Sequence, residues 1–204
     1  SFEEKSRFRL EPQNETLALN RLKIGAFLQM TFAGVPFIYY GDEIGMRYVE
    51  NLTSVEGGYD RTGSRSPMQW DKTLNAGFSL ASPEKLYIKQ DESDDRPDAE
   101  SQMADENSLY NEIRKLISIR RSHSALGNNS EIEFIYAEKN EYPLAFIRSS
   151  EDEKILVIIN PADREVSFPC EYKPKEAVYS FGKEIAYEDK KITVPPCSAG
   201  FYKV

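Results

Sequence analysis

Asp42 and Glu43 are adjacent carboxylates that follow a short apolar run, and they are the first candidates for acid–base chemistry in this sequence. Two carboxyl groups that flank one bond can act together as nucleophile and general acid. Side chains of adjacent residues leaving a strand point in opposite directions, however, so this pair is badly placed to flank one bond. We therefore interpret both residues as supports that orient neighbouring loops through hydrogen bonds.

The histidine and the cysteines form no recognisable site in the sequence. His123 is the only histidine, and no carboxylate or cysteine stands near it at a spacing typical of a site, so we interpret it as structural. Cys170 and Cys197 lie beside prolines and match neither a Cys-x-x-Cys nor a Cys/His metal pattern. They are either two separate thiols or a bridge between neighbouring strands. The sequence therefore predicts no metal site and no cofactor.

The long segment 41–105 holds the remaining polar and aromatic candidates but shows neither helical nor strand periodicity. A stretch of that length without regular structure is usually a functional loop or a disordered linker. Its aromatic residues favour an ordered loop. They are Tyr48, Tyr59, Trp70, Phe78 and Tyr87.

Two elements precede this loop and can position it. Residues 16–33 are apolar on nearly all sides, which is typical of a buried helix. Gly34 and Pro36 end that helix, because proline disfavours helical backbone at the residue before it. The run at 37–40 is aromatic and β-branched without polar alternation, which predicts a central parallel strand covered on both faces.

After the loop the sequence changes its pattern. A second helix is predicted over 106–121, with one apolar stripe and either Asp105 or Asn107 as its cap. Short strand patterns separated by turn residues then predict an antiparallel sandwich or open barrel. These patterns cover 131–137, 143–149, 154–159, 165–168, 177–179, 192–194 and 200–204.

The charge balance excludes several classes of partner. The chain of 204 residues has 34 acidic and 26 basic side chains, a formal net charge of −8. With no basic run, it is a poor candidate for binding nucleic acid or an anionic membrane, and no apolar run of about 18 residues could span a bilayer. The chain starts at Ser1 without a signal core, and we expect it to be a piece of a longer protein.

Four stretches of the sequence together resemble a known family. They are GVPFIYYGDEIGM at 34–46, RSPMQWD at 65–71, NAGFS at 75–79, and the QMAD, SL and RKLISIRR segments within 102–121. These segments are similar to the eighth strand, the following loop and the last helix of glycoside hydrolase family 13, the α-amylase family. The second stretch resembles oligo-1,6-glucosidases and trehalose synthases in particular.

The resemblance implies a fold of two parts, α/β followed by all-β. Residues 1–128 would be the C-terminal part of a (β/α)8 TIM barrel, with its last strand, long loop and last helices. Residues 129–204 would be a small antiparallel β-sandwich. Active sites of such barrels lie on the loops after the strands, so the loop after Tyr40 should face the sugar site.

The resemblance also implies a function, that of a retaining glycosidase acting on short α-glucosides by hydrolysis or transglycosylation. Such enzymes need two carboxyl groups, and this family adds an aspartate in an Asn-His-Asp motif. None of these motifs has a match here, and His123 stands elsewhere. We therefore expect no catalytic residue in this chain, which alone should be inactive. Its partners would be a small α-glucoside or oligosaccharide and either the remainder of the barrel or a partner chain.

The site residues come from the same resemblance. The arginine that matches Arg65 lies at the closed end of the pocket for the non-reducing glucose, and a guanidinium offers fixed donors to hydroxyls. A structural ion pair is the alternative for Arg65. Asp60 is predicted to line the same loop. Trp70 would either stack on a sugar ring or anchor the loop as a buried side chain, while Asp42 and Glu43 would support the loop.

Two other functional classes fit parts of the sequence. The β domain could be the working part of a non-catalytic carbohydrate-binding or interaction module. The RSPMQWD loop argues against that reading, because the loop makes sense only beside a complete barrel. The chain could also belong to an inactive amylase-like protein.

Overall fold

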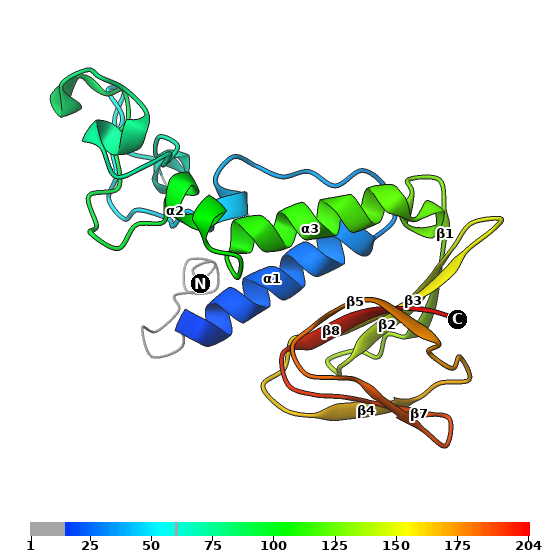
Figure 1. The fold of residues 1–204 in the computed structure, drawn as a ribbon. Helices are drawn as coiled ribbons and strands as arrows, with labels where there is room; N and C mark the ends of the chain where they lie inside the picture. The colour runs from blue at the N-terminus through cyan, green and yellow to red at the C-terminus, as the bar shows by residue number, and fades with distance from the viewer. Residues whose placement is uncertain (1–14, 60) are drawn as a thin grey trace. The chain divides into compact units, whose positions relative to one another are not determined.

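The computed structural model describes residues 15–59 and 61–204, and Figure 1 follows the chain through them. Contacts divide it into two compact units. One unit joins the chain up to Pro36 to Lys115–Val204, and the other is Phe37–Arg114. The units cut across the predicted boundary at residue 128, because the helix before Pro36 packs against the β strands. Each unit is described by itself below.

Helix α1 (Glu15–Thr31) covers one face of the β domain. Its Phe27 is fully buried, and the ring centroids of Phe27 and Phe201 are 3.8 Å apart. Leu19 and Leu22 are nevertheless 41% and 48% exposed. The expectation of burial on nearly all sides is thus only partly met, because the strands cover one side of a helix whose apolar residues surround its axis.

The strands of the β domain are antiparallel and form two sheets, drawn in yellow-green to red in Figure 1. The larger sheet has the order β1-β2-β3-β8-β5 and the smaller one β4-β7-β6. The strands are β1 (Glu131–Tyr136), β2 (Leu144–Ser149), β3 (Lys154–Asn160), β4 (Val166–Pro169), β5 (Glu176–Phe181), β6 (Ala186–Glu188), β7 (Lys191–Val194) and β8 (Ser198–Lys203). The predicted antiparallel sandwich is confirmed, and the short β6 is an addition to the predicted strands.

The core of the β domain lies between the two sheets. It contains Ile147, Leu156 and Ile158 of the larger sheet and Phe168 and Ile192 of the smaller one, all buried. Because α1 covers the other face of the larger sheet, strand β3 is buried on both faces after its first residue. This explains why β3 reads as a continuous apolar run rather than an alternating one.

Arg148 in β2 is fully buried and ties the end of α1 to the turn before β1. Its guanidinium donates hydrogen bonds only to backbone carbonyls, those of Thr31, Gly127, Ser130 and Glu131. Burial, with a smaller contribution from the like charge of a neighbouring arginine, lowers the pKa of Arg148 to about 10. The side chain therefore stays charged at neutral pH, and the carbonyl dipoles stabilise that charge.

Helix α3 (Leu109–Ser122) confirms the second predicted helix, but it starts later. The cap is Ser108 rather than Asp105 or Asn107, since the Asn111 amide donates to Ser108 Oγ at 3.1 Å. Near its end Arg120 donates to the carbonyls of Met30, Phe32 and Gly34. A short 3-10 turn, η7 (Ser124–Leu126), follows.

His123 contacts a carboxylate in the first unit, and neither cysteine forms a disulfide. His123 Nδ1 and Glu153 Oε1 are 2.6 Å apart, and the Ala125 amide donates to the same carboxylate. Burial acts to raise the pKa of Glu153, but the hydrogen bonds from His123 and Ala125 outweigh it and the pKa is lowered. Cys170 and Cys197 are free thiols, so the alternative of a bridge is excluded here.

The second unit consists of turns around a small core of Ile44, Met68 and Ala99. Its short helices are η3 (Asp42–Ile44), η4 (Thr62–Arg65), η5 (Leu74–Gly77), η6 (Pro83–Lys85) and α2 (Ala99–Ala104). The long segment is therefore ordered, as its aromatic residues predict. No helix among the described residues is long and apolar enough to cross a membrane.

Residues 37–40 do not form a regular strand in this chain. Phe37 is 85% exposed and Tyr39 51% exposed. A parallel strand needs neighbours on both edges and cover on both faces. The described residues offer no parallel neighbour, because every sheet they form is antiparallel and belongs to the other unit.

Candidate functional site

The second unit contains a pocket of about 480 Å³ that we call the aromatic pocket. It brings together Arg65, Glu43 and Trp70, three of the residues singled out from the sequence. The described residues that line it are Tyr40, Glu43, Arg65, Pro67, Met68, Trp70, Phe78, Leu86, Tyr87 and Ile88. Its size and its mixture of aromatic surface with few polar groups are typical of small-molecule sites.

Arg65 lies at the end of η4, with an exposed side chain at the wall of the aromatic pocket. Among the described residues it forms no salt bridge, so the alternative of a structural ion pair has no partner there. Tyr40 Oη donates to the Ser66 carbonyl at 3.1 Å. Burial and the neighbouring Tyr39 raise the pKa of Tyr40, while the charge of Arg65, which lines the same pocket, opposes that effect.

Asp42 and Glu43 bind backbone amides of their own turn. Asp42 Oδ2 accepts from the Tyr39 amide at 3.0 Å, and Glu43 Oε2 accepts from the Gly41 amide at 2.8 Å. Gly41 has a φ of 90°, which favours glycine at this turn. Glu43 lines the aromatic pocket and Asp42 does not. The two carboxylates therefore fix the turn after residue 40 and do not face one another across the pocket.

Trp70 is 50% exposed, and Phe78 and Tyr87 are similarly exposed in the same lining. Its side chain is therefore not a buried anchor, whereas its neighbours Pro67 and Met68 are buried. Exposed aromatic faces can stack on the apolar face of a sugar ring. Sequence reasoning missed Tyr40, Phe78 and Tyr87 as lining residues, because the aromatic residues of the loop indicated only its order.

Asp60, the other predicted substrate-binding residue, lies outside the described residues. Its neighbour Arg61 lies over the Tyr59 ring at 5.4 Å and does not line the aromatic pocket.

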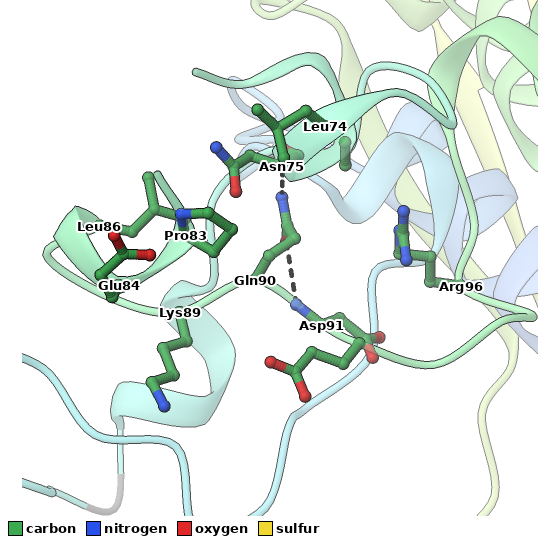
Figure 2. A pocket seen from close by; sticks show the side chains of 11 residues that line it. Leu74, Asn75, Pro83, Glu84, Leu86, Lys89, Gln90, Asp91 and Arg96 are labelled. Atoms are coloured by element: carbon green, nitrogen blue, oxygen red, sulfur yellow. Dashed lines mark hydrogen bonds between the residues drawn. The ribbon is translucent and has the colours of Figure 1, made fainter. Parts of the chain in front are cut away.

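A second cavity, the polar pocket, has about 400 Å³ and includes none of the predicted site residues (Figure 2). Its lining is Leu74, Asn75, Ala76, Pro83, Glu84, Leu86, Lys89, Gln90, Asp91, Glu92 and Arg96. Leu86 belongs to both pockets, so the two are neighbours. Several of its polar groups bind each other: Gln90 Nε2 donates to the Asn75 carbonyl, and the Asp91 amide donates to Gln90 Oε1.

The described lining residues of the aromatic pocket are mostly aromatic or apolar, with few charged groups. Glu43 is the one carboxyl group among the described lining residues, and it accepts a hydrogen bond from a backbone amide. Among the described residues no group of three His, Cys, Asp or Glu side chains could hold a metal ion. The pocket thus offers aromatic faces and a guanidinium, which suit a polyhydroxylated ligand.

Comparisons with known proteins agree along most of the chain. The family profile "Alpha amylase, catalytic domain" matches residues 5–129, and "Maltogenic Amylase, C-terminal domain" matches residues 132–200. A trehalose synthase/amylase of Mycobacterium tuberculosis is 32% identical over 71% of this chain and 24% of its own length. The oligo-1,6-glucosidase of Parageobacillus thermoglucosidasius is 28% identical over 89% of this chain and 37% of its own.

Solved structures give the same picture. The trehalulose synthase MutB of Pseudomonas mesoacidophila MX-45 superposes with a TM-score of 0.75 and 26% identity, over 90% of this chain and 38% of that one. A MutB variant in complex with glucose superposes with a TM-score of 0.76 and 26% identity, over 95% of this chain and 39% of that one. This chain therefore spans less than two fifths of the length of these proteins.

Proposed function

The chain belongs to the α-amylase family, and on that premise we propose that it is the C-terminal part of a retaining glycosidase acting on short α-glucosides. Within that enzyme it supplies part of the substrate pocket but not the catalytic carboxylates. Residues 1–128 complete the barrel, and residues 129–204 form the β domain beside it. The limits of the two matching profiles support this division.

The observation that carries the proposal is Arg65 at the wall of a pocket lined by aromatic rings. A guanidinium donates several hydrogen bonds in a fixed geometry, which suits the hydroxyls of one glucose unit. The faces of Trp70 and Tyr87 offer apolar surface to the ring of the same sugar. Relatives support a glucoside as ligand, since one MutB variant is in complex with glucose and another with sucrose.

Bond cleavage requires groups from outside this chain. A retaining glycosidase uses one carboxylate as nucleophile and a second as general acid and base. Among the described lining residues Glu43 is the one carboxyl group, and the sequence has no Asn-His-Asp motif. The remainder of the barrel, on the same chain or on a partner, supplies both groups. Water as acceptor then gives hydrolysis, and a sugar as acceptor gives transfer.

The test is the kinetics of the intact protein with isomaltose, trehalose, sucrose and maltose compared side by side. We expect Arg65→Ala to lower kcat/KM by about 10- to 100-fold, the effect of losing charged hydrogen bonds. Arg47→Ala is the matched control, because Arg47 is an exposed arginine paired with Asp95 and does not line the pocket. Equal activity of the two variants would show that Arg65 does not bind the substrate.

The same experiment separates the alternatives of an inactive relative and a binding module. Sugar binding without turnover of any of the four substrates would contradict the enzymatic part of the proposal. Binding that requires only residues 129–204 would place the ligand in the β domain and contradict the role of the aromatic pocket.

A further inference from the structure

The wall of the aromatic pocket from Met68 to Trp70 is held through its backbone. The Gln69 carbonyl accepts from the Ala99 amide at 3.0 Å, and the Trp70 carbonyl accepts from the Glu100 amide at 2.9 Å. These two bonds fix the wall to the start of α2. They leave the Trp70 amide free to be bound from the other side of the segment.

That amide is bound by the turn of η5. The Trp70 amide donates to the Ala76 carbonyl at 2.8 Å, and the Asp71 amide donates to the same oxygen at 3.3 Å. Asn75, Ala76 and Gly77 all have positive φ values, of 52°, 54° and 71°. This conformation is strained for Ala76, and such strain persists only where surrounding contacts determine it. The position of Trp70 therefore depends on whatever holds this turn.

Two side chains hold this turn. Asn75 Nδ2 donates to the carbonyls of Ser79 and Ala81, and Gln90 binds the turn from the polar pocket (Figure 2). Gln90 Nε2 donates to the Asn75 carbonyl at 3.1 Å and makes a longer contact of 3.5 Å with the Met68 carbonyl. Its Oε1 accepts from the Asp91 amide at 3.0 Å, which fixes the direction of the carboxamide. The Gln90 side chain thus connects the η5 turn to the 68–70 wall of the aromatic pocket.

We propose that Gln90 is a positioning residue for substrate binding. It sets the spacing between the η5 turn and the 68–70 wall, and so places Trp70 against the bound sugar. This inference rests on the proposed function, because it assigns the aromatic pocket to the substrate. Gln90 touches no sugar itself, since it lies in the lining of the polar pocket and not of the aromatic one.

The consequence is a specific kinetic pattern. A misplaced wall weakens binding of the substrate and of the transition state alike, which raises KM and leaves kcat unchanged. A merely structural role would instead reduce the fraction of folded enzyme, which lowers apparent kcat and leaves KM unchanged.

The experiment compares Gln90→Met and Gln90→Glu in the intact protein. Met has a similar length but donates nothing, and ionised Glu cannot donate to the carbonyls of Asn75 and Met68. We expect KM for the best α-glucoside to rise about fivefold to tenfold, with kcat within about twofold of wild type. Asn111→Leu is the matched control. The Asn111 carboxamide, like that of Gln90, donates to backbone carbonyls, but these belong to residues that line neither pocket.

Hydrogen–deuterium exchange gives a readout that needs no activity. In Gln90→Met, amides within 66–77 should exchange about tenfold faster, since the bonds of Trp70 and Asp71 to the turn open more often. Asn111→Leu should leave that peptide unchanged. Unaltered exchange at 66–77, or a fall in kcat at constant KM, would overturn the positioning role. Absence of α-glucosidase activity in the wild type would instead refute the proposed function, and the exchange result would still stand.

Discussion

Two arginines show how environment decides the role of a single side chain. Arg65 is exposed at a pocket wall and forms no salt bridge with the described residues. Arg148 is fully buried, and its donors are taken up by backbone carbonyls. The first is therefore placed where a ligand could reach it, as the proposed function requires, and the second is a structural tie.

Replacing Arg148 by Met should lower the free energy of unfolding of the first unit by about 2–4 kcal/mol, because buried carbonyls lose their donors. Urea unfolding followed by circular dichroism measures the change. Lys203→Met serves as control, since Lys203 forms an exposed pair with Glu176. A loss no larger than in that control would show that Arg148 does not tie α1 to the β domain.

Because His123 and Glu153 form a pair, we expect the stability of the first unit to fall at low pH. The pKa of Glu153 is lowered in the folded state, so its contribution is present above its unfolded pKa of about 4.3 and is lost as pH falls through the folded value. Glu153→Gln should therefore lose less stability than wild type between about pH 5 and pH 3. Glu151→Gln is an exposed neighbouring control. An equal loss of stability with falling pH in wild type and Glu153→Gln would refute the contribution of the His123–Glu153 pair.

At the scale of elements, hydrophobic periodicity predicted the helix and the strands whose pattern the local sequence determines. The stripe of α3 and the strand patterns of the β domain are confirmed within a few residues, and the family resemblance is confirmed by the matching profiles. The run at 37–40 is predicted to be a parallel strand, and such a strand without its neighbours leaves both edges unpaired and its apolar faces exposed, as the exposure of Phe37 and Tyr39 shows. The contact between Gln90 and Asn75 could not be predicted from the sequence, since it depends on a turn with unusual backbone angles.

The cap of α3 is a test at this scale. Ser108→Ala removes the acceptor of the Asn111 amide and should destabilise the second unit by about 1 kcal/mol. Ser108→Asp should retain most of the stability, because a carboxylate also caps a helix. Thermal melts of both variants give the comparison. If the alanine and aspartate variants melt together at the wild-type temperature, another residue caps the helix.

At the scale of the whole molecule, each of the two units exposes apolar side chains. Phe37, Tyr39, Leu19 and Leu22 are all more than 40% exposed. The relatives it matches are more than twice its length. We infer that this surface is covered by the remainder of the barrel, and that without it the chain associates with itself.

Light scattering after gel filtration tests that inference on the isolated 204 residues. We expect oligomers, and we expect added detergent below its micelle concentration to dissociate them, because their contacts are apolar. A stable monomer with slowly exchanging amides at 37–40 would show that the chain needs no further segment to cover this surface.

The most direct test of the central claim is a crystal structure of the intact protein, with its nucleophilic carboxylate replaced, in complex with isomaltose. We predict the non-reducing glucose in the aromatic pocket, with Arg65 within about 3 Å of its hydroxyls, Trp70 against its ring, and both catalytic carboxylates supplied from outside this chain. A sugar bound elsewhere with Arg65 out of reach, or a catalytic carboxylate among residues 1–204, would contradict the account.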